Sequence, residues 1–219
     1  MSVNEWILTI DGPSGSGKGT VAQLVARKLG WHYLDSGALY RVLGVLALRK
    51  KMDLEDESSL ADVARNLELS FQSGDVFLGS ERISEEIRTE QTGNLASKIA
   101  TMHPVREALL QWQRDCAKAP GLVADGRDMG TVVFPRAKYK IFLTASVSAR
   151  AQRRFKQLRD KGFGVNIRRL LHEIAERDER DMNRVISPLR AADDAICLDS
   201  TNMGIDEVVS SVMNLVRFE

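Results

Sequence analysis

The chain has 219 residues and a formal charge of +1, which suits one domain with a substantial apolar core and excludes a strongly basic nucleic-acid-binding protein. Its two cysteines, Cys116 and Cys197, have neither metal-ligand nor redox-motif spacing, so we expect free thiols in a reducing cytoplasm. The apolar run at residues 42–48 is too short to cross a bilayer. We therefore expect a cytoplasmic protein without membrane or nucleic-acid partners and, since no long exposed apolar stripe is evident, a monomer.

The first predicted elements surround a glycine-rich turn. Residues 6–10 (WILTI) suit a short strand, and Lys18–Leu29 has apolar side chains at helical spacing. The glycines of the intervening GPSGSGKGT let backbone N–H groups approach a phosphate, the helix N-terminus points at the anion, and Lys18 adds a full charge. We expect a nucleoside triphosphate to bind here, through Gly12, Pro13, Ser14, Gly15, Ser16, Gly17, Lys18, Gly19 and Thr20.

The loop departs from the G-K-[ST] pattern, because Gly19 follows Lys18 and the hydroxyl comes one place later, at Thr20. A hydroxyl at position 19 is therefore not available to Mg²⁺, and Thr20 is a weaker candidate ligand. Asp35 and Asp125, at the carboxyl ends of predicted strands, could orient waters on Mg²⁺. Either could equally cap the N-terminus of a helix.

Strands and helices alternate along most of the chain. Short apolar segments typical of buried strands lie at residues 6–10, 32–36, 122–125, 139–145 and 195–200. Each has a helical stretch beside it, which predicts an α/β fold with a central five-stranded parallel sheet flanked by helices. Residues 67–84 instead show short alternating segments broken by turns, so we expect a small antiparallel sheet in an inserted subdomain at 60–103.

Arginine is used unevenly along the chain. It supplies 21 of the 31 basic residues, and ten of these arginines lie within residues 150–190. Guanidinium groups suit bidentate binding of phosphate, so the excess favours an anionic ligand, although a solvated helix face would give the same run of charge. Arg150, Arg153 and Arg154 share one helix face, and we expect a short helical lid at 148–165 that closes over the nucleotide.

A second charged cluster interrupts an amphipathic helix that begins near Asn166. Apolar residues repeat on one face up to Ile174, after which Arg177, Asp178 and Asp181 continue the same face. Charged side chains on an inward-facing stripe must be paired or bound to a ligand, which favours a polar cavity. The pattern is equally compatible with a helix that outruns the core, in which Arg177 and Asp181 form an ordinary pair one turn apart.

Segments from most of the chain resemble bacterial cytidylate kinases, which are nucleoside monophosphate (NMP) kinases, a group that also has G-K-G-T in its loop. The segments are DSGALYR (35–41), VREALL (105–110), ADGRDMGTVVFP (124–135), KIFLTAS (140–146) and ERDERDMNR (176–184). Adenylate kinases would be expected to have Asp-Gly-Phe/Tyr-Pro-Arg in place of DGRDMG. The resemblance implies one P-loop kinase domain over 1–219, with a core at 1–59, 104–147 and 166–219, an NMP-binding insertion at 60–103 and a lid at 148–165.

The resemblance also implies in-line transfer of the γ-phosphoryl group of ATP to CMP or dCMP with Mg²⁺, and a role for each matching residue. Cytosine would be bound by Ser36, Ser97, Arg106, Asp128 and Arg184. Ribose would be held by Arg177 and Asp181, the acceptor phosphate by the catalytic Arg41 and Arg127, and the donor phosphates by the catalytic Lys18. Uracil would present a carbonyl to Asp128 where cytosine presents an amine, which implies discrimination against UMP.

A phosphate acceptor is already anionic, so the expected sources of rate are positioning and electrostatic stabilisation rather than a general base. Two other readings of the loop stay open. One is a P-loop kinase for another small acceptor, such as a sugar or a shikimate-like acid, with Asp35 or Asp125 as base. The other is a nucleotide-binding switch module that signals by ordering its loops.

Overall fold

The computed structural model describes residues 6–72, 75–160, 162 and 164–217, which form two compact units. The first comprises the described parts of Met1–Asp35 and Cys116–Glu219, and the second comprises those of Ser36–Asp115. Residues 73–74 of the predicted insertion and 161 and 163 of the predicted lid lie outside the described residues. Within the described ranges no helix has the length and apolar character needed to cross a membrane.

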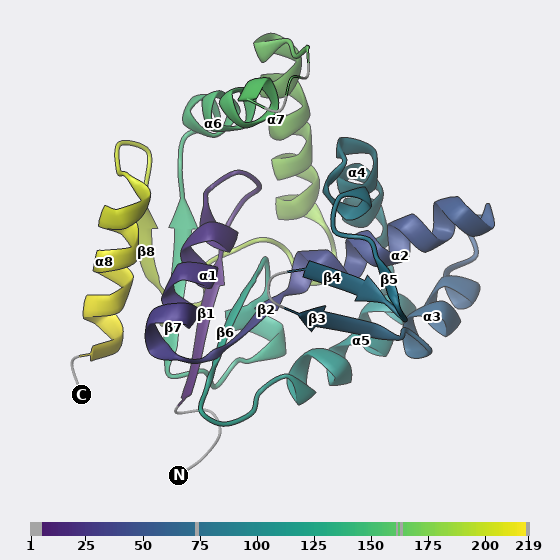
Figure 1. Ribbon diagram of the computed structural model, residues 1–219, viewed down its shortest axis with the longest axis horizontal. Coiled ribbons are helices and arrows are strands. Elements are labelled where there is room, and N and C mark those ends of the chain that lie inside the picture. The colour runs from purple at the N-terminus through teal and green to yellow at the C-terminus, as the bar shows by residue number, and fades with distance from the viewer. Residues whose placement is uncertain (1–5, 73–74, 161, 163, 218–219) are drawn as a thin grey trace. The chain divides into compact units, whose positions relative to one another are not determined.

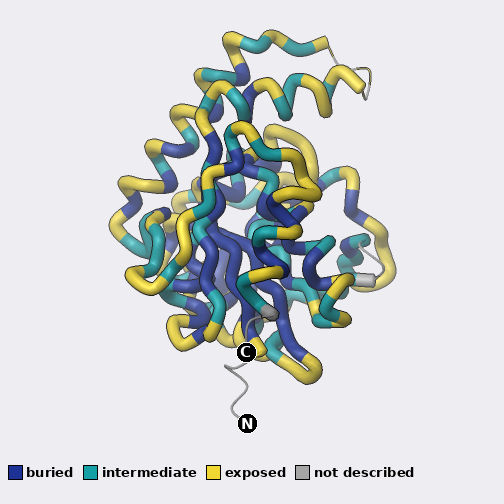
Figure 2. Tube along the Cα trace, turned by 90° about the vertical axis from the view of Figure 1, so that its left-hand side faces the viewer, coloured by how far each residue is buried: buried dark blue, intermediate teal, exposed yellow. Residues whose placement is uncertain are grey.

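The first unit is built on a parallel sheet of five strands in the order β2-β6-β1-β7-β8 (Figure 1). The strands are β1 (Ile7–Asp11), β2 (His32–Asp35), β6 (Leu122–Gly126), β7 (Tyr139–Thr144) and β8 (Ile196–Asp199). Every residue of β1 and β6 is buried, and the strands at the centre of the molecule are dark blue in Figure 2. Asp11 pairs with Gly126, so the loops after β1 and β6 begin at the same edge of the sheet.

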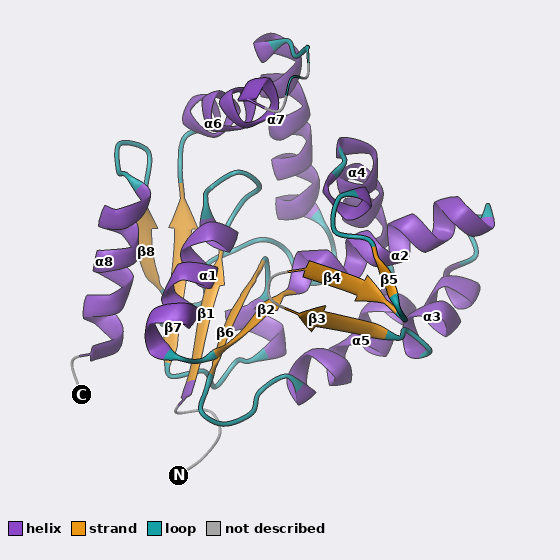
Figure 3. Ribbon diagram, in the orientation of Figure 1, coloured by secondary structure: helices purple, strands orange, loops and turns teal. Residues whose placement is uncertain are grey.

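Helices flank this sheet (Figure 3). They are α1 (Lys18–Leu29), α6 (Val147–Asp160), α7 (Ile167–Asn183) and α8 (Ile205–Arg217), with a π-helical turn η3 (Met129–Val133). The apolar core contains Val25 from α1 and Val212 from α8. Helix α1 has the bounds that the sequence predicts, because Gly17 and Gly30 on either side adopt left-handed conformations. The predicted α/β fold with a five-stranded parallel sheet is confirmed.

Strand β8 differs from the buried strand that its apolar sequence predicts. It lies at the edge of the sheet, paired with β7, and Ile196, Cys197 and Asp199 are exposed. An edge strand has a neighbour on one side only, so fewer of its side chains are covered. Leu198 is the residue of β8 that packs against the core.

The second unit combines helices with an antiparallel sheet in the order β3-β4-β5. Its elements are α2 (Ser36–Lys50), α3 (Glu57–Arg65), β3 (Leu69–Gln72), β4 (Asp75–Leu78), β5 (Glu81–Arg82), the 3₁₀ turn η2 (Glu86–Arg88), α4 (Glu90–Ile99) and α5 (His103–Asp115). Leu43 of α2 packs with Ile99 and Leu109, and Val45 packs with Ile83 under the sheet. The predicted small antiparallel sheet is confirmed.

Candidate active site

The loop between β1 and α1 has a conformation that requires glycine at two points. A Cβ at Gly12 would lie 2.1 Å from the carbonyl oxygen of Leu143, and Gly17 has a φ of +90°. Gly17 is the N-cap of α1 and provides no side-chain acceptor, so the N–H groups of the first helical turn stay available to an anion. The buried hydroxyl of Ser16 has no hydrogen-bond partner in the described chain. These features fit a bound phosphate.

Lys18 lies at the start of α1 with its side chain folded over the loop. Its Nζ donates a hydrogen bond of 3.1 Å to the carbonyl oxygen of Pro13, and the residue is 8% exposed. Burial, followed by the positive charges of Arg127 and Arg177, lowers the pKa of Lys18 to about 7, although nearby carboxylates oppose the shift. An anion bound beside this amine would favour its protonated form.

Asp125 lies within β6 and beside Asp35 in the register of β2 and β6, so Asp125 caps no helix. The hydroxyl of Tyr33 donates to its Oδ1 at 2.6 Å. Burial and then the charge of Asp35 raise the pKa of Asp125 to about 7. A Cβ at Gly19 would lie 3.7 Å from Oδ2 of Asp125, whereas Thr20 is exposed. Position 19, which lacks a hydroxyl, therefore lies beside this carboxylate.

A buried carboxylate that the sequence analysis missed joins β1 to η3. Oδ1 and Oδ2 of Asp11 accept hydrogen bonds from the N–H groups of Met129 and Gly130, at 2.9 and 2.8 Å. Burial raises the pKa of Asp11 to about 6 despite these donors. Asp11 thereby fixes the start of η3, and the buried Asp128 is the N-cap residue of this turn. The signal in the sequence that could have identified Asp11 is an acidic residue at the end of an otherwise apolar strand.

The two carboxylates on the charged face of α7 are buried and Arg177 is half-buried, so this helix does not simply outrun the core. Asp178 is 7% exposed and Asp181 is 3% exposed. Nε of Arg127, in the loop after β6, donates to Oδ2 of Asp181 at 2.7 Å, and its Nη1 donates to the carbonyl oxygen of Gly126 at 3.4 Å. Arg184 ends the helix and is also buried, with its Nε donating to the carbonyl oxygen of Ser187.

Two of the arginines assigned to the lid contact the phosphate loop from α6. Arg150 donates through Nη1 to the carbonyl oxygen of Ser14 at 2.9 Å and forms a buried ion pair with Asp178. Arg153 donates to the carbonyl oxygen of Ser16 at 3.3 Å. The third arginine of this set binds within its own helix, where Nη1 of Arg154 donates to Gln157 at 2.8 Å.

The remaining predicted site residues belong to the second unit and come from α2, α4 and α5. Ser36, Ser97 and Arg106 are buried. Nη1 of Arg106 donates to the hydroxyl of Tyr40 at 3.2 Å, and its guanidinium carbon lies 5.9 Å from the centre of the same ring. Nη1 of Arg41 donates to the carbonyl oxygen of Ile87 at 2.8 Å.

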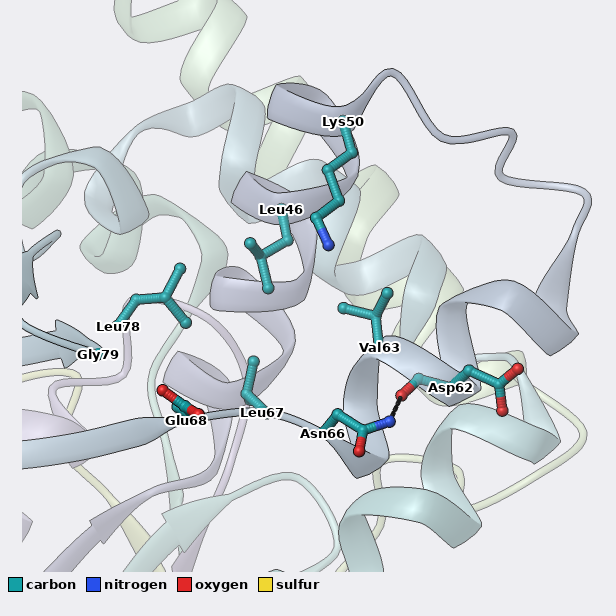
Figure 4. Close-up of a pocket in the computed structure, with 9 residues that line it drawn as sticks. All are labelled: Leu46, Lys50, Asp62, Val63, Asn66, Leu67, Glu68, Leu78 and Gly79. Atoms are coloured by element: carbon teal, nitrogen blue, oxygen red, sulfur yellow. Dashed lines mark hydrogen bonds between the residues drawn. The ribbon is translucent and has the colours of Figure 1, made fainter.

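The second unit also has an open cavity of ≈ 510 Å³ between side chains of α2, α3, β4 and the segment after α3 (Figure 4). Its apolar lining consists of Leu46, Val63, Leu67 and Leu78. None of the predicted site residues lines it.

Comparison with known proteins identifies a family whose members match nearly the whole chain. A family model described as cytidylate kinase matches residues 8–218. A protein named cytidylate kinase from Aeromonas salmonicida is 59% identical over 211 residues, which cover 94% of this chain and 92% of that protein. Another of the same name, from Shewanella baltica, is 53% identical over 223 residues, or 99% of this chain and 97% of that protein.

Among solved structures, an uncharacterized protein from Eubacterium ventriosum matches this fold with a TM-score of 0.54 at 12% identity, covering 98% of this chain and 99% of that one. A likeness at this identity supports the fold alone.

Proposed function

Because the chain belongs to the cytidylate kinase family, we infer that it transfers the γ-phosphoryl group of ATP to CMP or dCMP, giving ADP and CDP or dCDP. The observation that carries this function is the family match over residues 8–218, which includes the glycine loop and the charged face of α7. The chain is thus an ATP-dependent NMP kinase. We further propose that it acts as a monomer in the cytoplasm, where its nucleotide substrates are free in solution.

On the donor side, we propose that residues 12–20 bind ATP. The N–H groups of the loop and the start of α1 face no side-chain cap, and Lys18 supplies a cation for the β- and γ-phosphates. Residues 148–165 are proposed as the lid. Within it, Arg154 is assigned to the nucleotide, while Arg150 and Arg153 are proposed to act on the donor site through the loop carbonyls that they hold.

We propose that Mg²⁺ binds beside Asp35 and Asp125, mainly through waters, with Thr20 a weaker candidate ligand. The residues fit such an ion, since Mg²⁺ in kinase sites needs only one or two carboxylates besides substrate phosphates and waters. Tyr33 holds one oxygen of Asp125, and the described chain gathers no cluster of three or more His, Cys, Asp or Glu suited to an all-protein metal site. When bound, Mg²⁺ would neutralise charge on the phosphates.

On the acceptor side, we propose that Asp128 and Arg106 read the cytosine, together with Ser36, Ser97 and Arg184. Asp128 is an acceptor for the exocyclic amine, and Arg106 donates to ring acceptors. The ribose is assigned to Arg177 and Asp181. The phosphate of CMP is assigned to the catalytic Arg41 and Arg127. The hydrogen bonds of Arg127 to Asp181 and Gly126 use two of its five N–H groups.

The function is tested by incubating the chain with Mg-ATP and each nucleoside monophosphate in turn and following ADP formation. We expect CMP and dCMP to give rapid turnover, UMP less, and AMP and GMP no more than the control without acceptor. Lys18→Met is the matched inactive variant. If CMP and dCMP stay at the control rate while a sugar or a shikimate-like acid is phosphorylated, the alternative kinase is correct. Slow hydrolysis that no acceptor changes would indicate the switch module.

A further inference from the structure

Arg150 uses nearly all of its hydrogen-bonding capacity inside the protein. The residue is 3% exposed. Its Nε donates to the carbonyl oxygen of Ala145 at 2.9 Å, and its Nη1 donates to the carbonyl oxygen of Ser14 at 2.9 Å and to Oδ1 of Asp178 at 3.0 Å. Nη2 donates to the other oxygen of Asp178. Four of the five N–H donors of a guanidinium are thus satisfied by the chain itself, which leaves little with which to bind ATP directly.

The carbonyl that Arg150 holds belongs to the phosphate loop. In a trans peptide the C=O and the following N–H point in opposite directions. When Arg150 draws the carbonyl of Ser14 toward α6, the N–H of Gly15 must therefore point away from α6. Gly15 has a φ of +77°, and a Cβ there would lie 3.2 Å from Cβ of Arg150, so the helix and the loop are in close contact. Arg153 repeats this arrangement at the carbonyl of Ser16.

The other side of the guanidinium is fixed by α7. Asp178 is buried, follows Arg177 directly and precedes Asp181 by three positions, so it belongs to the charged face assigned to the nucleoside. The pair is bidentate, which fixes the plane of the guanidinium as well as its position. Helix α7 and the loop are thereby joined through one side chain.

We propose that Arg150 is a positioning residue for the donor site. Paired with Asp178, it holds the peptide between Ser14 and Gly15 so that its N–H is directed to a phosphate of ATP, and it does not bind ATP itself. This inference rests on the proposed function for the identity of the ligand. It assigns to the lid helix a role in shaping the loop before the nucleotide arrives.

The test must separate positioning from stability, because Arg150→Met alone leaves Asp178 charged and buried without its partner. The double variant Arg150→Met/Asp178→Leu removes both charges and replaces them with apolar side chains of similar volume. Such a replacement of a buried ion pair is often neutral for stability. Arg150→Lys keeps a cation for Asp178 but cannot reproduce the forked contact to both partners. The control is Arg169→Gln/Glu173→Gln, which removes an exposed ion pair of the same helix.

Each variant is examined for melting temperature, for affinity for Mg-ADP by titration calorimetry, and for hydrogen exchange of the loop amides. We expect the double variant to melt close to the wild type yet to bind Mg-ADP about tenfold more weakly, as the loss of one or two oriented hydrogen bonds would give. Its loop amides should exchange faster. Arg150→Lys should weaken binding in the same direction, and the control should leave all three readouts unchanged.

The proposal is overturned if either folded variant binds Mg-ADP within twofold of the wild type and keeps the wild-type exchange of its loop, since Arg150 would then only pack. Should the double variant not fold, Arg150→Lys alone decides. Binding of Mg-ADP requires no acceptor. A wild-type chain that bound Mg-ADP and failed to phosphorylate CMP would therefore refute the proposed function while leaving this test intact.

Discussion

Replacement of Asp181 by asparagine tests the buried ion pair at the centre of the charged face of α7. The carboxylate lies 2.7 Å from Nε of Arg127, and the two side chains are 4% and 16% exposed. Burial alone would raise the pKa of Asp181, but the charges of Arg127, Arg177 and Arg184 lower it from 3.8 to about 2. This difference corresponds to about 2 kcal/mol of stability at neutral pH.

The sign of the pH dependence follows from the lowered pKa. The stabilisation is fully present above the pKa of the unfolded chain, near 3.8, and is lost as the pH falls toward 2. Asp181→Asn should therefore reduce the free energy of unfolding, measured by urea titration, by about 2 kcal/mol at pH 7 and by about half as much at pH 3. Glu173→Gln, which removes an exposed pair, should cost less than about 1 kcal/mol.

Steady-state kinetics of the same variant test the assignment to ribose. We expect the KM for CMP to rise about tenfold, as for loss of one charged hydrogen bond, with the KM for ATP changed less than about twofold. An unchanged KM for CMP would remove Asp181 from the acceptor site. A destabilisation equal at pH 7 and pH 3 would refute the reasoning about its pKa.

Three further substitutions probe neighbouring groups. Asp128→Ala should lower the ratio of kcat/KM for CMP over UMP by about a hundredfold with little effect on Mg-ADP affinity; an unchanged ratio would place Asp128 outside the base pocket. Tyr33→Phe removes the hydrogen bond that holds one oxygen of Asp125. It should raise the Mg²⁺ concentration needed for half-maximal rate at least about tenfold, whereas an unchanged Mg²⁺ titration contradicts the metal assignment. Asp11→Asn removes a group whose pKa burial raises to about 6, so the contribution of Asp11 to wild-type stability falls as the pH rises from 4 to 6. The deficit of the variant in urea unfolding should be larger at pH 4 than at pH 7 by about 2 kcal/mol, and a constant deficit would refute this.

The fold was predictable because its signals are local in the sequence. A buried strand, a glycine turn and an amphipathic helix occupy consecutive residues, and the bounds of α1 follow from glycines at both of its ends. The exposure of β8 was not predictable, because its composition resembles that of β7. Its place at the edge of the sheet depends on the order of all five strands.

Candidate site residues could be named from the sequence only where they form motifs or resemble a family. The partners of Asp11, Tyr33 and Arg150 lie 118, 92 and 136 positions away along the chain, respectively at η3, Asp125 and Ser14. No periodicity links residues at such separations. Each of these contacts arises where the carboxyl ends of parallel strands and the following loops come together in space.

The tertiary structure also determines the role of the many arginines between residues 150 and 190 and of Arg127. Arg127 and Arg150 each meet a buried carboxylate of α7, so their charges are balanced before any ligand binds. Lys18 is different, because its amine donates to the neutral carbonyl of Pro13, and burial followed by the charges of neighbouring arginines lowers its pKa to about 7. A buried amine in this setting gains most from a polyanion. The arginines that hold the loop and helices in place are thus paired with carboxylates, whereas the amine at the proposed phosphate position is held by a neutral carbonyl.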